Sequence, residues 1–138
     1  MSRRKARQDA MCIIYEIDMQ KSEEQEILKR FFATHDMNEA DASYINEVIN
    51  LIVQHKDEID QYVEKSSGRN IEYLAKIDLA ILRIAAVEIL YLDYIPVKVS
   101  IDEAIELAKI YGDDMSPSFI NGVLAGLLKQ LCKEGEET

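Results

Sequence analysis

Apolar residues recur every three or four positions along almost the whole chain, and no segment alternates between apolar and polar residues as a half-buried strand does. The pattern predicts an all-α fold: a compact bundle of about seven helices in a single domain, residues 1–138, with a basic N-terminal tip and a polar, frayed C-terminal tail. The expected helical segments are residues 3–20, 23–34, 41–65 with a bend near His55, 71–74, 78–91, 100–111 and 117–132.

Two short motifs predict helix starts. Residues 22–25 (SEEQ) and 100–103 (SIDE) each place a serine three residues before a glutamine or glutamate, so that each side chain satisfies a free backbone amide. Pro96 disfavours helix at the residue before it. Residues 93–99 are therefore expected to form a loop that ends at the second motif.

Three further residues predict helix ends and a start. Gly68 is suited to a left-handed cap after the long helical stretch, and Gly112 stops the next-to-last helix. Ser116 is expected to be the N-cap of the last helix, with Pro117 at the first helical position, where its missing N–H costs nothing.

The segment 79–90 (LAILRIAAVEIL) is apolar nearly all round, which predicts a buried central helix. Glu88 is the exception within it. A carboxylate there needs donors, so we expect Glu88 to cap backbone amides or to pair with an arginine. Since one buried acid without a second reactive group makes no mechanism, the interpretation of Glu88 is structural.

Catalytic and metal-binding motifs are missing from the sequence. It has no glycine-rich phosphate loop, no G-x-S-x-G and no dinucleotide fingerprint, and His35 and His55 belong to no metal motif. Cys12 and Cys132 lie at opposite ends and are expected to be reduced, partly buried thiols in the cytoplasm. The sequence therefore predicts a protein that is not an enzyme and needs no cofactor or metal, with no membrane span and no signal peptide.

Charge is distributed unevenly along the chain. The net charge is −10, yet residues 1–10 carry net +3, which leaves −13 on the rest. A basic tip on an acidic body is compatible with a local RNA contact and a separate protein partner. A solvated basic terminus remains the alternative.

On a helical wheel the first helix has two faces. Arg4, Arg7, Met11 and Tyr15 fall together, with Tyr15 almost opposite the core. Arginine contacts phosphate bidentately and a tyrosine ring can stack on an unpaired base. The wheel leaves two interpretations open: a single-stranded RNA platform, or an exposed or partner-packed tyrosine beside a solubilising basic end. The predicted core stripe consists of Ala6, Ala10, Ile13, Ile14 and Ile17.

Three groups of residues together resemble the bacterial NusB family of transcription antitermination factors. They are residues 3–7 (RRKAR) with Ile14 and Tyr15, residues 81–85 (ILRIA) followed by Glu88, and residues 96–109 (PVKVSIDEAIELAK) with the later 121–124 (NGVL). The resemblance covers essentially the whole chain and is strongest in its second half. Where some members of the family carry an acid just before the serine of the last helix, this sequence has Met115.

The resemblance implies a seven-helix fold that binds boxA-type single-stranded RNA of nascent ribosomal-operon transcripts together with ribosomal protein S10. Other Nus factors and RNA polymerase complete the antitermination complex in that family, and premature termination is suppressed. By the same resemblance, S10 contacts the region around Asp78. The RNA contacts implied for this sequence are Arg3, Arg4, Lys5, Arg7, Tyr15, Ser118 and Phe119.

Hydroxyls and free backbone amides at the start of the last helix, residues 116–119, add a second anion-friendly place. About four basic phosphate contacts predict a logarithmic salt slope near −3 for single-stranded RNA. The alternative functions are a helical module that binds only proteins and self-association, for example as a homodimer. The fold also occurs at the N-terminus of ribosomal RNA methyltransferases, but no methyl-donor domain follows in this sequence.

Overall fold

The computed structural model describes residues 2–21 and 23–137, and these residues form seven α-helices, one short 3₁₀ helix (η1) and no strand. The all-α prediction is confirmed. The element bounds are α1 Ser2–Gln20, α2 Glu24–Thr34, α3 Glu39–Gln54, α4 Lys56–Ser67, η1 Ile71–Tyr73, α5 Lys76–Tyr91, α6 Val97–Tyr111 and α7 Ser116–Glu137.

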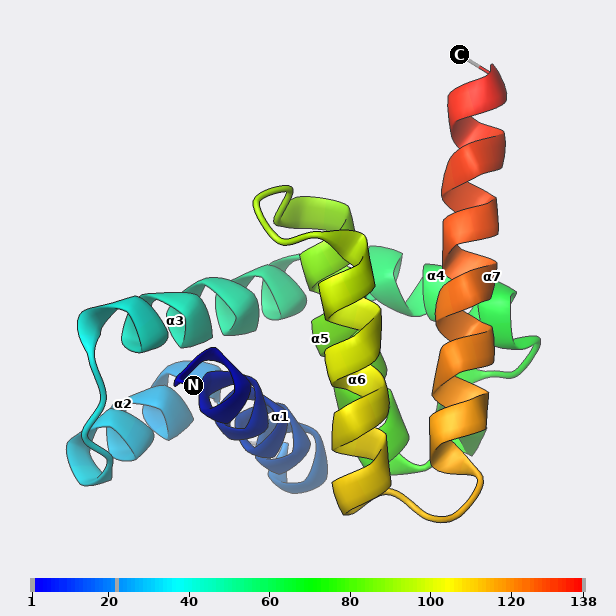
Figure 1. Cartoon of the computed structure of the whole chain (residues 1–138). Coiled ribbons are helices and arrows are strands. Elements are labelled where there is room, and N and C mark those ends of the chain that lie inside the picture. The colour runs from blue at the N-terminus through cyan, green and yellow to red at the C-terminus, as the bar shows by residue number, and fades with distance from the viewer. Residues whose placement is uncertain (1, 22, 138) are drawn as a thin grey trace.

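Helix α5 lies at the centre of the molecule. Every side chain from Asp78 to Glu88 is buried, as the uninterrupted apolar pattern predicted. Helices α1 and α3 pack against it from one side and α4, α6 and α7 from the other, while α2 covers α1 and α3 (Figure 1). Because α5 is enclosed on all sides, the polar groups on it must be satisfied by its neighbours.

The buried face of α1 is wider than the predicted stripe. Arg7 and Met11 are buried together with Ala6 and Ala10, because α1 is packed against α2, α3 and α5 rather than against one neighbour. The helical wheel placed Arg7 and Met11 on an exposed face, and that prediction is wrong.

Both predicted capping boxes differ from the observed caps. The N-cap of α2 is Glu23, whose carboxylate accepts hydrogen bonds from the amides of Gln25 and Glu26; Ser22 lies outside the described residues. Helix α6 begins at Val97, directly after Pro96, so Ser100 lies inside the helix and is buried. Its hydroxyl donates to a buried carboxylate instead of capping a helix.

The remaining helix boundaries follow the sequence more closely. His55 separates α3 from α4 at the expected bend, and Gly68 caps α4 in the left-handed conformation, with φ of 71°. Helix α7 continues to Glu137, past the point where a frayed tail was predicted. Both cysteines are exposed free thiols rather than partly buried ones. Among the described helices, none has the length and apolar character needed to cross a membrane.

Candidate functional site

Two cations of the first turn of α1 are exposed, and each is held by an acid. The guanidinium of Arg4 donates from Nε and Nη2 to the Glu103 carboxylate of α6, over 2.9 and 2.6 Å. Lys5 Nζ donates to Asp9 Oδ1 over 2.6 Å. The side chains of Arg4 and Lys5 are 58% and 65% exposed, so both can reach a ligand. A phosphate there would compete with the carboxylate already bound.

Arg7 lies one turn further along α1 and is nearly inaccessible. Its side chain is 6% exposed and that of Glu88 is 1% exposed, and the two form a bidentate ion pair through Nε at 2.8 Å and Nη2 at 3.1 Å. Burial opposes ionisation of Arg7, but the hydrogen bonds to Glu88 and its charge outweigh burial, so the pKa of Arg7 is raised. The expectation that Glu88 pairs with an arginine is confirmed.

Two more donors complete the coordination of Glu88. The hydroxyl of Ser100 donates to Oε1 over 2.7 Å, and the buried hydroxyl of Tyr44 donates to Oε2. Burial and the neighbouring Glu88 charge raise the pKa of Tyr44 above its usual range. The guanidinium of Arg3 lies over the Tyr44 ring, 4.6 Å from its centroid. Arg3 is thus tied to the same cluster through the aromatic ring.

Tyr15 occupies the other half of α1 and is not opposite the core as predicted. Its ring is partly buried and packs against the core cluster. Together with Met19, Asp78 and Ser116 it lines a hollow of about 360 Å³ between α1, α5 and the turn from α6 to α7. The structure therefore brings Tyr15 next to the start of α7, at the far end of α1 from Arg4.

The turn before α7 has a tight local geometry. Asp113 Oδ1 accepts hydrogen bonds from the amides of Met115 and Ser116, while Ser116 Oγ accepts one from the Asp113 amide. Asp113 thus supplies the cap that was predicted for Ser116. Gly112 is required for this approach, because an added Cβ would lie 2.5 Å from the Ser116 side chain.

Ser118 and Phe119 lie on the first turn of α7. Ser118 is exposed, while Phe119 is partly buried against the core. The guanidinium of Arg69 lies 5.1 Å from the centroid of the Phe119 ring. Sequence reasoning missed Arg69 because it comes from the turn after α4, far from Phe119 in the chain.

Asp78 is in the first turn of α5 and is only 7% exposed. Its Oδ1 has no hydrogen-bond partner among the described residues, and burial is the main reason that its pKa is raised, against the opposing hydrogen bond of Ser116. It lies at the wall of the hollow that Tyr15 and Ser116 line.

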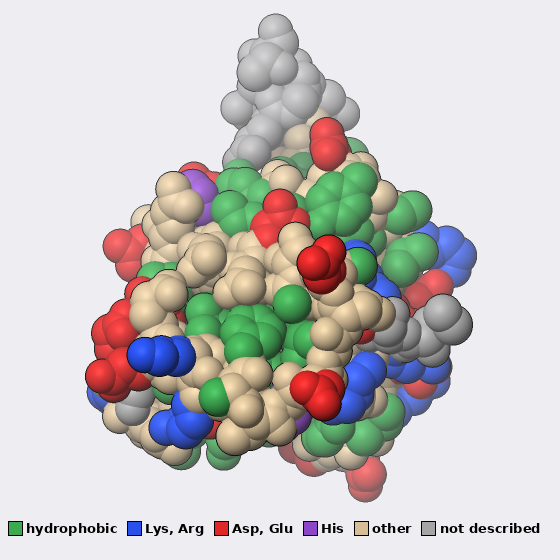
Figure 2. Space-filling model, turned by 90° about the vertical axis from the view of Figure 1, so that its left-hand side faces the viewer, with side chains coloured by type: hydrophobic (Ala, Val, Ile, Leu, Met, Phe, Trp, Pro, Cys, Tyr) green, Lys and Arg blue, Asp and Glu red, His purple; other side chains and the backbone are tan. Residues whose placement is uncertain are grey.

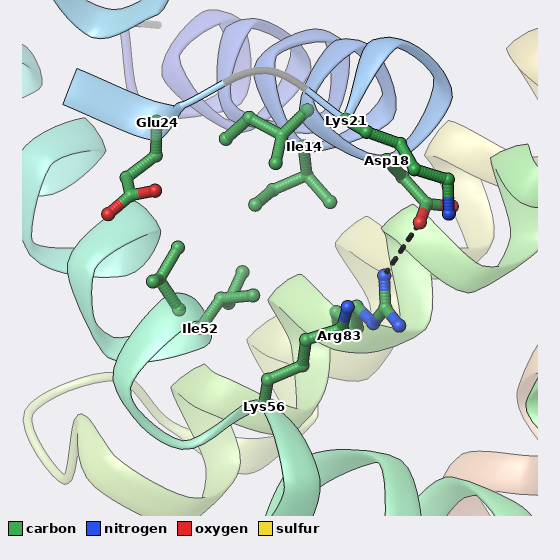
Figure 3. Close-up of a pocket in the computed structure, with 9 residues that line it drawn as sticks. Ile14, Asp18, Lys21, Glu24, Ile52, Lys56 and Arg83 are labelled. Atoms are coloured by element: carbon green, nitrogen blue, oxygen red, sulfur yellow. Dashed lines mark ion pairs between the residues drawn. The ribbon is translucent and has the colours of Figure 1, made fainter. Parts of the chain in front are cut away.

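A second hollow, of about 270 Å³, lies where α1, α3, α4 and α5 meet (Figure 3). Ile14 and Ile52 form its apolar part and Arg83 its main charged group. Arg83 donates from Nε and Nη2 to Asp60 of α4, over 2.9 Å each, and lies 3.9 Å from Asp18 of α1. These ion pairs of Arg83 join α1, α4 and α5. Arg83 and its two acids therefore stabilise the packing of these helices.

The surface formed by α2 and α3 has no broad patch of one sign. Figure 2 shows lysines and arginines in small groups among acidic side chains, around a central hydrophobic cluster.

The chain matches the NusB family over residues 4–129. The transcription antitermination protein NusB of Clostridium novyi is 46% identical over 132 residues, which cover 94% of this chain and 99% of that protein. The corresponding protein of Acetivibrio thermocellus is 42% identical over 130 residues, covering 94% and 90%.

Solved structures agree with this match. T. maritima NusB has a TM-score of 0.84 at 28% identity, covering 92% of this chain and 90% of that one. A chain from the crystal structure of antitermination factors NusB and NusE in complex with dsRNA has a TM-score of 0.85 at 25% identity, covering 94% and 97%. The fold is that of known NusB structures. This chain belongs to the NusB family of transcription antitermination factors.

Proposed function

We propose that this chain is a non-enzymatic cytoplasmic antitermination factor that binds boxA-type single-stranded RNA together with ribosomal protein S10. In the complex with other Nus factors and RNA polymerase, it suppresses premature termination on ribosomal-operon transcripts. The observation that carries the proposal is the likeness, over 94% of this chain, to a chain solved with NusE, which is S10, and double-stranded RNA.

Within the chain, the proposed RNA surface begins at the exposed first turn of α1. Arg4 and Lys5 supply phosphate contacts, and Arg3, stacked on Tyr44, supplies a third. From there the surface follows α1 to Tyr15 and ends on the first turn of α7. At that end the exposed hydroxyl of Ser118 and the ring of Phe119 offer a hydrogen bond and a stacking face.

The burial of Arg7 changes the expected salt dependence. The two exposed cations Arg4 and Lys5 and the partly buried Arg3, three cations instead of four, lower the expected logarithmic salt slope from about −3 to about −2 for single-stranded RNA. A shallow slope agrees with a chain of net charge −10, since the acidic body repels the rest of the RNA.

We place the S10 contact at the hollow beside Asp78. Asp78 lies in the wall of this hollow with its Oδ1 buried and without a hydrogen-bond partner among the described residues, and Met115 in the adjoining turn is 71% exposed and provides apolar area. S10 in this hollow would contact Tyr15 and the turn before α7, where the proposed RNA surface ends, and it leaves the first turn of α1 open for phosphate contacts.

The test is fluorescence anisotropy with a labelled boxA-type single-stranded RNA, a scrambled RNA of equal length and a double-stranded form, each with and without S10. We expect preference for the boxA-type strand, tighter binding with S10, and the slope of about −2. The variant Arg4→Ala/Lys5→Ala removes two of three contacts and should flatten the slope to about −0.7.

A matched control is Lys65→Ala/Lys129→Ala, which removes two exposed cations from α4 and α7. It should leave both affinity and slope unchanged. Association with S10 without affinity for any RNA would support the protein-only module instead. Sedimentation at several concentrations tests the homodimer, which would dissociate on dilution.

A further inference from the structure

The carboxylate of Glu88 connects four helices. It projects from α5 and accepts hydrogen bonds from Arg7 of α1, Tyr44 of α3 and Ser100 of α6. All four side chains are buried. Such a centre fixes the position of the N-terminal half of α1 against the other three helices, because each donor must keep its place for the buried charge to remain satisfied.

Arg7 is the only cation within hydrogen-bond distance of that carboxylate in the described part of the chain. If its guanidinium turned outward to meet a phosphate, the Glu88 carboxyl would be left buried without its counter-charge, which is strongly unfavourable. Arg7 therefore cannot serve as a phosphate contact without disrupting the core beneath α1.

The same centre reaches the exposed cations through two routes. Tyr44 joins it to Arg3, whose guanidinium lies on the Tyr44 ring. Glu103 lies 3.7 Å from Arg7 Nη1 and holds Arg4 by two hydrogen bonds. Tyr44 and Glu103, the groups that contact Arg3 and Arg4, are thus both tied to the buried pair, while Arg4 can still exchange Glu103 for a phosphate.

We propose that Arg7 and Glu88 are positioning residues for RNA binding: the buried pair holds in place the first turn of α1, which carries Arg3, Arg4 and Lys5. This inference rests on the proposed function. It divides the basic tip into residues that contact the phosphates and one arginine that holds them in place.

The decisive variant is Glu88→Gln, because the two possible roles of Arg7 predict opposite signs. If Arg7 is a positioning residue, weakening its anchor lowers affinity for the labelled boxA-type RNA by about tenfold and leaves the salt slope near −2, since the contacts are unchanged. If Arg7 contacts phosphate, removing its competing carboxylate raises affinity and steepens the slope. The second result would overturn the proposal.

A double variant separates positioning from general damage to the fold. Arg7→Gln/Glu88→Gln replaces the ion pair by two neutral amides and leaves no buried charge without a partner. Positioning predicts that affinity recovers toward wild type with the slope still near −2. Loss of a phosphate contact predicts a slope flatter by about 0.7, which would contradict the proposal.

Tyr44→Phe provides a milder variant if the others unfold. It removes one donor to Glu88 but keeps the ring under Arg3. RNA affinity should fall about two- to threefold because one hydrogen bond to Glu88 is lost. Hydrogen exchange of the first turns of α1 should accelerate. Unchanged affinity with unchanged exchange would overturn the proposal.

RNA binding by the wild type and by Arg4→Ala/Lys5→Ala distinguishes failure of the proposed function from failure of the positioning role. If wild-type protein binds the labelled RNA with no salt dependence and Arg4→Ala/Lys5→Ala binds equally well, the proposed function is wrong. If these two behave as expected and Glu88→Gln binds RNA like wild type, the RNA surface stands and only the positioning role is wrong.

Discussion

Two arginines one turn apart on α1 have the same kind of partner and opposite surroundings. Arg4 and Arg7 each form a bidentate ion pair with a glutamate from another helix. The side chain of Arg4 is 58% exposed, and that of Arg7 is 6% exposed. Water reaches Arg4 of the first pair, whose partner Glu103 is 14% exposed, and the protein interior encloses the second pair.

The difference shows that residue type alone does not decide whether an arginine in the first turns of α1 binds a ligand or stabilises the core. An exposed pair is weak and exchangeable, so Arg4 can leave Glu103 for a phosphate at small cost. A buried pair is costly to break, so Arg7 stays with Glu88. In the first pair Glu103 competes with a phosphate for Arg4, whereas the Arg7–Glu88 pair is part of the core.

The largest expected effect is on stability at the buried pair. Glu88→Ala leaves the Arg7 guanidinium buried without its counter-charge, so the free energy of unfolding should fall by about 3–5 kcal/mol. Urea unfolding followed by circular dichroism measures it. A matched control is Glu106→Ala, at an exposed glutamate one turn along α6 from Glu103, which should change stability by less than about 0.5 kcal/mol. Equal losses in both variants would show that burial does not distinguish the two sites.

A smaller loss of stability is expected when Tyr44, an uncharged member of the same cluster, is changed. Tyr44→Phe keeps the buried ring and removes only the hydroxyl that donates to Glu88. Since Glu88 Oε2 still accepts a hydrogen bond from Arg7, the free energy of unfolding should fall by about 1.5–3 kcal/mol, the contribution of one hydrogen bond to a charged group. The same urea experiment tests it, and a loss as large as that of Glu88→Ala would mean that the hydroxyl, not the charge, dominates.

The sequence predicted where the helices lie, but the prediction of which face of α1 is buried was wrong. The apolar run of α5 and the cap at Gly68 depend on local pattern, and both were predicted. The burial of Arg7 depends on Glu88, which lies 81 residues away, and no helical wheel contains that contact. Ser100 was read as a cap because a local rule fits it, yet a distant buried carboxylate takes its hydroxyl.

For the exposed pair the expected effect is on RNA affinity. Glu103→Gln removes the charge that holds Arg4 and keeps the size of the side chain. Arg4 is then free for phosphate, so affinity for boxA-type RNA should rise about two- to fivefold, the scale of one exposed ion pair. Anisotropy titrations against wild type check it, with Glu72→Gln, at an exposed glutamate of η1, as the control for general charge effects. A fall in affinity would mean that Glu103 orients Arg4 rather than competing for it.

The smallest effect is the pH dependence of the same pair. The hydrogen bond from Arg4 is the main reason that the pKa of Glu103 is lowered. Burial raises this pKa, the charges of Arg4 and Arg7 lower it further, and the charge of Asp102 raises it. Since the folded-state pKa lies below the unfolded value of about 4.3, the pair's contribution is complete above that pH. It is lost as pH falls through the lower folded-state pKa. The unfolding free energy of wild type minus that of Glu103→Gln should therefore be constant near neutral pH and shrink in acid. A difference that grows in acid would mean that Glu103 is stabilised in its protonated form, which two hydrogen bonds from a guanidinium do not allow.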